Sequence, residues 1–293
     1  MAVHRQPVAS ADVSSSDLRE FTGFLLRLAY VRAVGAERSC MPDDGHVGEM
    51  TVLSVLAEHG AVSQRELSDI TSINPTVTVR QVDAIEARGW VVRDRNPADR
   101  RSYALRLTPA GHAALLALSR DLDRAEADLT SALSLAETRR LKRRLTELLV
   151  DDPLIAVGSL AERAGFLIAR AHRTVRGWAE PQLAILGIHP PHFGVLAVVG
   201  REQPCSQSLV ATRMRITAPA VLGFIDELEA AGLLQRSRND ADRRSNDVVL
   251  TAPGRTCLAA AMAVGKSVQE EIVRRLGASG EAELRSLLRK LIA

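Results

Sequence analysis

A gapless internal repeat constrains this chain more than any other feature of its sequence. The segment from Ile85 to Gly111, IEARGWVVRDRNPADRRSYALRLTPAG, returns 143 positions later as LEAAGLLQRSRNDADRRSNDVVLTAPG, with 14 of 27 residues identical. The register of 143 extends from Met50 and Phe193 to Leu149 and Ile292. A chain of 293 residues has room for about two domains of ordinary size. We therefore expect two copies of one folding unit.

Each copy of the repeated segment predicts the end of a helix, a β-hairpin and the start of a new helix. A glycine, Gly89 or Gly232, ends the first helix, and a polar turn rich in arginine separates two short strands. The turn repeats the sequence Asp-Arg-Arg at 99–101 and 242–244. Because this hairpin is too polar to be buried, we expect a wing that contacts DNA. A solvated surface hairpin is the alternative, although its occurrence twice with the same tip argues against it.

The composition is that of a helical globular protein, with 46% hydrophobic, 25% charged and only 3% aromatic residues. The net charge of +3 is too small for a polycation, so a nucleic-acid footprint must come from local clusters. The wings supply such clusters: Arg93, Arg95, Arg100, Arg101 and Arg106 in the first copy, and Arg236, Arg238, Arg243 and Arg244 in the second.

No membrane or secretion signal is visible in the sequence. The first sixteen residues lack the apolar core of a signal peptide, and no apolar run approaches the ~20 residues of a membrane helix. Cys40, Cys205 and Cys257 form no CxxC pair, and an odd count argues against a disulfide framework. We therefore expect a reduced, cytoplasmic protein without a membrane partner. Cys40, in an expected loop, leaves redox sensing open as an alternative.

Helical periodicity and capping residues predict a winged helix-turn-helix in the first copy. A helix from about Ser16 to Ala36 and a second ending at Gly60 come first. Ser63 and Glu66 then form a capping box before the short helix QRELSDIT. Asn74 and a proline begin a further helix over 75–87, which precedes the wing.

In such a module the second helix of the pair enters the major groove and presents its N-terminal residues to base edges. Arg80 is able to read guanine through two hydrogen bonds, with Thr76 and Thr78 beside it. Ser63 and Gln64 lie where a helix N-terminus accepts a phosphate oxygen, although Ser63 as a cap alone is the alternative. The wing arginines Arg100 and Arg101 would follow phosphates or enter the minor groove. The second copy offers Ser206, Gln207, Arg213, Arg215, Arg243 and Arg244.

The remaining helices complete the two copies. We expect helices from Thr108 to about Ser131 and from Leu135 to Leu149, and in the second copy a helix from about Ser159 to Trp178, helices over 190–200 and 219–230, and two closing helices over 251–293. The expected division is a disordered arm over 1–16, a first repeat over 17–150, a linker over 151–153 and a second repeat over 154–293.

This order of elements resembles the MarR/SlyA family of bacterial transcription regulators. DRRSYALRLTPAG and DRRSNDVVLTAPG are similar to the family's acidic-arginine wing motif, which ends in LT and a glycine, and the resemblance covers about residues 17–293 twice. It implies a mainly α fold with small β-wings (α+β), a tandem winged helix-turn-helix whose terminal helices intertwine as they do in family dimers. Because so short a linker would suffice to join two such subunits, we expect a single-chain pseudo-dimer, alone or in a further assembly.

The second copy departs from the family pattern at its recognition helix. It reads APAVLG over 218–223, and Gly223 aligns with Arg80. Loss of a bidentate arginine removes roughly 1–3 kcal/mol of discrimination at a base. The second head is therefore expected to hold DNA through its wing, Arg213 and Arg215 but to read less sequence. An imperfect or asymmetric operator follows, with half-sites about one helical turn apart.

The resemblance also implies a ligand-responsive repressor that binds double-stranded DNA and needs no cofactor. Its effector would be a small aromatic or phenolic molecule, bound between the terminal helices and the DNA-binding lobes. The candidate lining residues are Tyr30, His46, His172, His189 and His192. A cap or surface role is the alternative for His46 and His189, and the HPPH sequence lacks the neighbours of a compact metal site.

An enzyme is not expected, because the sequence contains no glycine-rich phosphate loop, GxSxG or HExxH. Two other functions stay open: a protein-interaction module with a degenerate second DNA-binding head, and a redox- or metal-responsive regulator on the same scaffold.

Overall fold

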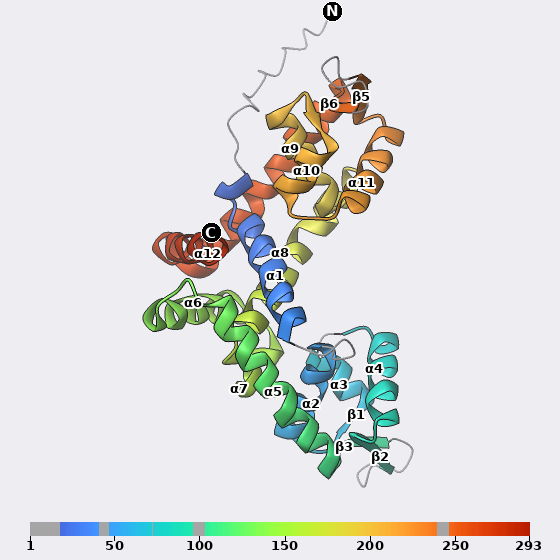
Figure 1. The fold of residues 1–293 in the computed structure, drawn as a ribbon, viewed down its shortest axis with the longest axis vertical. Coiled ribbons are helices and arrows are strands. Elements are labelled where there is room, and N and C mark those ends of the chain that lie inside the picture. Colours follow the sequence, from blue (N-terminus) through green and yellow to red (C-terminus); the bar gives the residue numbers. More distant parts are fainter. Residues whose placement is uncertain (1–17, 41–46, 72, 96–102, 239–245) are drawn as a thin grey trace, which may run out of the picture. The chain divides into compact units, whose positions relative to one another are not determined.

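The computed structural model describes residues 18–40, 47–71, 73–95, 103–238 and 246–293 (Figure 1). They form two compact units: unit 1 holds the described residues up to Leu28 and Arg173–Gly277, and unit 2 holds Ala29–His172 and Ala278–Ala293. Three helices contribute to both units, namely α1 (Thr22–Cys40), α8 (Ala164–Ile185) and α12 (Ala252–Ile292). Each unit therefore contains the head of one repeat and terminal segments of the other.

Unit 2 contains the first winged-helix head. Its elements are α2 (Val47–His59), β1 (Val62–Ser63), α3 (Gln64–Thr71), α4 (Pro75–Ala87), β2 (Val91–Arg95), β3 (Tyr103–Leu107), α5 (Pro109–Leu129), α6 (Leu135–Leu148), η3 (Pro153–Ala156) and α7 (Gly158–Ala161). The sheet is antiparallel with the order β1-β3-β2. An aliphatic core that includes Leu53, Leu67, Ile85 and Leu105 joins the helices to the sheet, which confirms the winged helix-turn-helix.

Unit 1 repeats this head. It contains η2 (Leu18–Glu20), α9 (Pro190–Glu202), β4 (Cys205–Ser206), α10 (Gln207–Met214), α11 (Ala218–Ala230), β5 (Leu234–Arg238) and β6 (Asn246–Leu250), with the sheet order β4-β6-β5. Cys205 lies opposite Val248, as Val62 lies opposite Leu105 in the first head. Both pairs are related by the 143-residue register, so the sequence repeat is a repeat of strand pairing.

One expected helix, from Ser159 to Trp178, is wrong. The structure divides it into α7 and α8, and α8 continues past Pro181. The break arises because Glu126 of α5 accepts hydrogen bonds from the backbone N–H groups of Ala164 (2.8 Å) and Gly165 (3.1 Å). A carboxylate on these otherwise unpaired donors stabilises a new helix start. The two closing helices are confirmed and meet at Gly277, whose φ of 69° marks the kink within α12.

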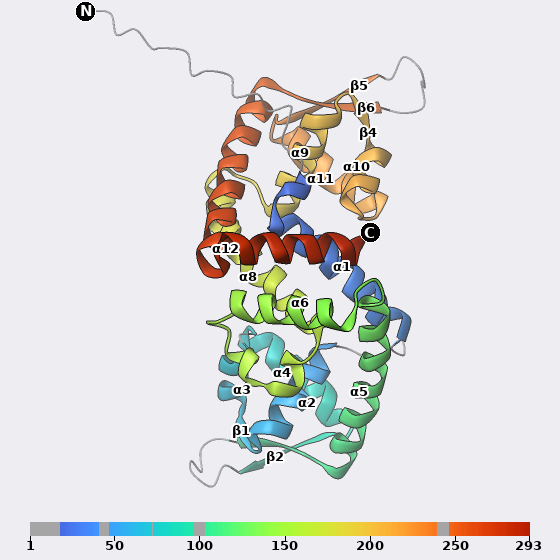
Figure 2. The same ribbon diagram turned by 90° about the vertical axis from the view of Figure 1, so that its left-hand side faces the viewer.

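The last segment of α12 packs against α6 within unit 2, as Figure 2 shows. Both helices bury the same four positions of the repeat: Leu141, Leu145, Leu148 and Leu149 on α6, and Leu284, Leu288, Leu291 and Ile292 on α12. We call α6 and residues 278–292 the terminal helix pair. A contact in which equivalent surfaces face each other is the arrangement of a two-fold interface.

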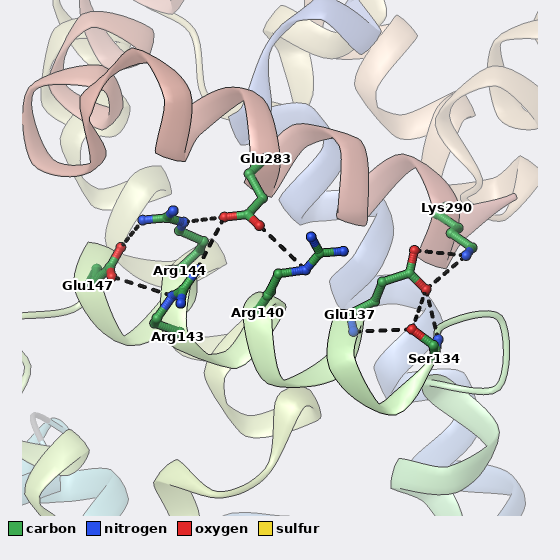
Figure 3. A network of polar contacts seen from close by, with 8 residues as sticks. All are labelled: Ser134, Glu137, Arg140, Arg143, Arg144, Glu147, Glu283 and Lys290. Carbon is green, nitrogen blue, oxygen red and sulfur yellow. Dashed lines mark hydrogen bonds and ion pairs between the residues drawn. The ribbon is translucent and has the colours of Figure 1, made fainter.

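Ion pairs flank the apolar seam of the terminal helix pair (Figure 3). Glu283 lies 2.6 Å from Nε of Arg144, and 3.5 Å from nitrogens of both Arg140 and Arg143. The hydrogen bond from Arg144 is the main cause that lowers the pKa of Glu283. At the other end, Lys290 and Glu137 pair at 2.9 Å. At one end a glutamate of the second repeat thus meets arginines of α6, and at the other end a lysine of the second repeat meets a glutamate of α6.

Among the described residues, no single helix is long and apolar enough to cross a membrane. Two pairs of consecutive helices, α8 with α9 and α10 with α11, reach the required length and apolar composition only when taken together, and each pair is sharply bent.

Candidate nucleic-acid interface

The N-terminus of α3 is closed by a reciprocal cap. The backbone N–H of Ser63 donates to Glu66 Oε2 at 2.7 Å, and the N–H of Glu66 donates to Ser63 Oγ at 3.2 Å. The hydrogen bond from the Ser63 backbone lowers the pKa of Glu66. The expected capping box is confirmed, and DNA contact by Ser63 and Gln64 stays a prediction.

The matching cap of α10 has no carboxylate. Ser206 Oγ accepts the N–H of Leu209 at 3.2 Å, and Leu209 stands where the first head has Glu66. A phosphate at this helix end would meet no negative charge from that position, so the second head is the better suited of the two for the phosphate contact predicted at Ser206 and Gln207.

The N-terminal turns of α4 present a mixed polar surface. Asn74 caps the helix by accepting the N–H of Thr76 at 2.9 Å. Thr76 and Arg80 are exposed, and Arg80 has no hydrogen-bond or ion-pair partner within the part of the chain that the structure describes. Its guanidinium is therefore available for a base edge, as predicted.

The expectation that Thr78 faces DNA is wrong. Its side chain is only 1% exposed, and its hydroxyl donates to the carbonyl oxygen of Asn74 at 3.3 Å. Thr78 shares the buried face of α4 with Val82 and Ile85, four and seven positions further on. That spacing is the helical period, so the sequence already contained the signal that places Thr78 in the core.

The corresponding surface of α11 is apolar. Leu222 is 44% exposed, Pro219 is exposed, and a Cβ built on Gly223 would meet no atom within 4 Å. The position of Arg80 is thus an open space on the second head, with no side chain to donate a hydrogen bond. The two recognition helices share a framework and differ in what they present.

One arginine of each wing fastens that wing to its recognition helix. In the first head Arg93 of β2 pairs with Asp83 at 2.5 Å and with Glu86, both on α4. In the second head Arg236 of β5 pairs with Asp226 and Glu229 of α11. The hydrogen bond with Asp226 is the main cause that raises the pKa of Arg236. We call these two sets of ion pairs the wing latches.

The wing latches change the predicted charge of the wings. Arg93 and Arg236 were expected in the positive clusters, and each is neutralised by two carboxylates. Arg106 pairs with Asp94, its Nε lying 2.9 Å from Oδ2. The sequence contained the signal for the latches, since all three latch residues recur at the register of 143.

The tips of both wings, with Arg100, Arg101, Arg243 and Arg244, lie outside the described residues, as does the side chain of Arg238. Their contact with DNA stays a prediction.

Arg213 and Arg215 lie at the end of α10, at the turn of the second helix-turn-helix. Nε of Arg213 is 3.1 Å from Glu202 Oε1, and the side chain of Arg213 is still about half exposed. Arg215 is exposed and ends α10 with a left-handed φ of 49°. Both stay predicted DNA contacts, from the turn and not from the recognition helix.

The repeated LT motif with its glycine has a structural role. Thr108 Oγ1 donates to the Gly89 carbonyl at 2.6 Å and accepts the N–H of Gly111 at 3.0 Å. A Cβ on Gly111 would lie 2.0 Å from the Trp90 carbonyl oxygen. Thr251 and Gly254 reproduce these contacts in the second head. The motif therefore fixes the start of the helix that follows the wing to the turn that precedes the wing.

The histidines expected to line an effector site have other surroundings. His192 is 7% exposed; its Nδ1 lies 3.3 Å from the backbone N of His189, and its Nε2 lies 2.7 Å from Glu227 Oε2. It occupies the position of the buried Glu49, which pairs with Arg88 at 2.6 Å in the first head. His189 is the N-cap residue of α9, in line with the alternative given for it.

Tyr30 and His172 stack with their ring centroids 4.7 Å apart. His46 lies outside the described residues.

A small cavity lies in unit 2 between α1, α2, α5 and the start of α8. It has a volume of about 20 Å³ and is lined by Glu37, Met50, Thr51, Leu122, Ala125, Glu126, Leu129, Leu160, Arg163, Gly165 and Phe166. Burial, reinforced by the charge of Glu126, raises the pKa of Glu37 to about 7. None of the five expected effector residues belongs to this lining. Sequence reasoning missed Glu37 and Glu126, although Glu126 stands among the buried residues Leu122, Ala125 and Leu129 of one helix face.

The described ranges contain no group of three or more His, Cys, Asp or Glu side chains that could hold a metal ion. Burial raises the pKa of the Cys205 thiol to about 11 and also raises that of Cys257. Both thiols are therefore held in the unreactive protonated form at neutral pH.

The chain matches known proteins in both halves. The sequence model of the MarR family matches residues 46–102 and again residues 186–245. A putative transcriptional regulatory protein for the hcr operon of Thauera aromatica is 30% identical over 157 residues, which cover 52% of this chain and 95% of that protein. The HTH-type transcriptional repressor NicR of Pseudomonas putida is 33% identical over 112 residues, 38% of this chain and 70% of the repressor.

Among solved structures, the transcriptional repressor CouR bound to a 23-mer DNA duplex shares 31% identity with this chain. The match covers 45% of this chain and 94% of CouR, with a TM-score of 0.43. Two separate matches to one family model fit a tandem arrangement of two family domains.

Proposed function

Because the chain belongs to the MarR family and is a DNA-binding transcriptional regulator, we propose that it represses transcription by holding an asymmetric operator with two non-identical heads. One observation carries this proposal. Two heads with the same strand register and the same wing latches present Arg80 on one recognition helix and Gly223 on the other. The first head reads bases, and the second contributes mainly phosphate contacts through Ser206, Gln207 and the turn arginines.

The terminal helix pair supports a single-chain pseudo-dimer. Its two helices bury equivalent positions of the repeat, as the two copies of one helix do across a two-fold dimer interface. A chain of this kind supplies both heads of one operator complex by itself, with half-sites about one helical turn apart. We infer a cytoplasmic, non-catalytic role, because the relatives are transcription regulators and DNA is the target.

A small-molecule effector regulates DNA binding in this proposal. The cavity of unit 2 lies against α2, which packs on α3 of the first helix-turn-helix. A ligand that binds one arrangement of these helices better than another shifts the population between DNA-binding and released states.

The test is selection of operators from a pool of random DNA duplexes by the full chain, followed by footprinting of the enriched site. We expect unequal half-sites. Arg80→Ala should lower the preference for one base pair of one half-site by roughly 5- to 150-fold. Gly223→Arg should add a preference in the other half-site. Arg120→Ala, an exposed arginine on α5 outside the helix-turn-helix, is the matched control and should leave the selected site unchanged.

A perfect palindrome protected equally in both halves would contradict the proposal. Failure to enrich any duplex, with Arg80→Ala indistinguishable from wild type, would favour the protein-interaction module instead. The exposed apolar surface of α11 around Leu222 is the observation that keeps this second function in view.

A further inference from the structure

The place in unit 1 that corresponds to the cavity of unit 2 has different residues at the positions of its three charged lining residues. The two copies align at an offset of 142 in their first helix, where Gly23 matches Gly165, and at 143 from Met50 onward. By this alignment unit 1 has Ala179 at the position of Glu37, Gln269 at that of Glu126 and Phe21 at that of Arg163. Phe193 replaces Met50. Unit 1 therefore has aromatic and neutral side chains at the positions where unit 2 has charged and flexible ones.

In unit 1 the counterpart is filled. A Cβ built on Gly265 would lie 3.4 Å from the ring of Phe21 and 3.5 Å from that of Phe193, and both rings pack against the core of the unit. Gln269 Oε1 accepts the N–H of Thr22 at 3.0 Å, as Glu126 Oε1 accepts that of Ala164 at 2.8 Å. The helix cap is preserved without its charge, so capping alone does not require a carboxylate at Glu126.

We propose that the cavity of unit 2 is the single effector site of the chain and that it binds the ammonium group of a primary amine. The proposal rests on the proposed function, in which a small molecule regulates DNA binding, and it adds the chemical class of that molecule and a stoichiometry of one per chain.

The charges around the cavity favour a cation. A Cβ on Gly165 would lie 3.6 Å from Glu37 Oε1 and 3.9 Å from Glu126 Oε2, so both carboxylates reach the same point. Over the described residues, Glu37 has no hydrogen bond or ion pair of its own. An ammonium group between these carboxylates would supply the missing positive charge, whereas a phenolate or carboxylate would be repelled.

The terminal groups of the cationic side chains nearby are engaged, while Nε of Arg163 has no hydrogen-bond partner among the described residues. Lys142 pairs with Glu126 at 2.9 Å. Arg163 directs its guanidinium to Asp123 at 2.8 Å and to Ser119 Oγ at 2.7 Å. Glu37 is therefore left uncompensated, which agrees with the rise of its pKa to about 7 through burial and the charge of Glu126.

The size of the cavity matches an ammonium head group, and its walls are largely apolar. About 20 Å³ accommodates a group the size of one water molecule, which an ammonium group is. Met50, Leu122, Leu160 and Phe166 supply apolar surface for the carbon atoms next to the head group. The half-buried Glu37 and Glu126 would form charge-assisted hydrogen bonds with it.

Three probes with one aromatic ring and different head groups test the proposal: 2-phenylethylamine, 2-phenylethanol and phenylacetate. Each is titrated into the full chain by calorimetry at pH 7, in phosphate and in Tris buffer. We expect the amine to bind once per chain and at least roughly tenfold more tightly than the alcohol, and phenylacetate not to bind. Because a bound cation lowers the pKa of Glu37, amine binding should release protons, which the difference in heat between the two buffers measures.

Variants locate the binding in unit 2. Glu37→Gln, and Glu37→Gln with Glu126→Gln, should lose the amine and the proton release, whereas Glu180→Gln, an ion-paired glutamate on α8 outside the cavity, should keep both. Glu37→Ala with Met50→Phe copies the filled counterpart and should also abolish binding. Circular dichroism of each variant verifies that it folds, and the single change Glu37→Gln remains informative if the double variants do not fold.

Several results would overturn the proposal: phenylacetate binding more tightly than the amine, two amines per chain, amine binding that persists in Glu37→Gln, or no binding of the amine. DNA binding of the same preparations is measured separately. If the amine does not bind but the operator does, only the proposed class of effector is refuted. If the operator does not bind, the proposed function is refuted.

Discussion

Arg140 and Glu283 occupy the same position in the two repeats, and they pair with each other, Nε of Arg140 lying 3.5 Å from Glu283 Oε1. In a dimer of identical subunits, this position would bring two copies of one charge together. The fused chain places opposite charges there, and Arg143 and Arg144 add to the attraction. Such complementarity selects partners more than it adds stability. It favours pairing of α6 with the last segment of its own chain over pairing with another α6.

Charge reversal at this position tests that selection. Glu283→Arg places a positive charge against the arginines of α6 that now pair with Glu283. We therefore expect the unfolding temperature to fall by roughly 2–4 °C. Adding Arg140→Glu should recover part of the loss, because one opposite-charge pair is restored. Thermal unfolding of wild type, the two single variants and the double variant, at low and high salt, measures the coupling between the two positions. Equal unfolding temperatures for all four chains at low salt would show that the pairing is energetically neutral.

The carboxyl group of Glu37 makes stability depend on pH. Its pKa rises to about 7 in the folded protein, while an unfolded glutamate titrates near 4.3. Between these values the folded state binds more protons than the unfolded state, so stability falls as pH rises through this window. We expect Glu37→Gln to be more stable than wild type at pH 8, on the order of 1–2 kcal/mol after allowance for solvent screening, and to lose this advantage at pH 4. Urea unfolding at both pH values measures it, and a constant difference would exclude the linkage.

The wing latch of the first head predicts a loss of DNA affinity without a change of base preference. Arg93→Ala releases the wing from α4 and leaves Asp83 and Glu86 without their arginine. Unpaired carboxylates beside the recognition helix repel phosphates, so binding of all duplexes should weaken together. Arg93→Lys should recover only part, because an ammonium does not bridge two carboxylates as a guanidinium does. Gel-shift titrations on the selected and on scrambled duplexes distinguish this pattern from that of Arg80→Ala.

The close approach at Gly111 predicts severe intolerance of any side chain. A Cβ there would lie 2.0 Å from the Trp90 carbonyl oxygen, which is backbone and cannot turn aside. We expect Gly111→Ala to lower the free energy of unfolding by more than roughly 2 kcal/mol. Gly177→Ala is the matched control, because it lies within α8 with no atom within 4 Å of its Cβ position. That change should be neutral or stabilising by up to about 1 kcal/mol. Comparable losses for both would contradict the steric argument.

The elements with local signals were predictable from the sequence. Asn74 and Pro75 begin α4 where the capping rules place it, and Ser63 and Glu66 begin α3. The break before α8 was not predictable in this way, because its cap comes from Glu126, 38 positions earlier in the chain. The two-residue strands β1 and β4 carry no periodicity of their own and exist only through pairing with the wing.

The candidate site residues divide in the same way, into those with a local sequence signal and those whose place depends on contacts distant in sequence. Arg80 is exposed on the surface where its type and position suggested. The histidines were chosen for their chemistry alone. The lining of the unit 2 cavity includes Glu37 and Glu126, whose proximity depends on the packing of α1 against α5. Residues brought together by helices distant in sequence are the part that a single sequence did not reveal.

The composition of unit 2 has a consequence for synthesis. Its last helix comes from residues 278–293, which leave the ribosome after both heads. Until then α6 has no partner for the leucine face formed by Leu141, Leu145 and Leu148. A polypeptide released early, near Gly277, would carry two complete heads and an uncovered apolar stripe of the kind that chaperones and proteases bind. Coverage of the leucine face of α6 therefore depends on synthesis of residues 278–293.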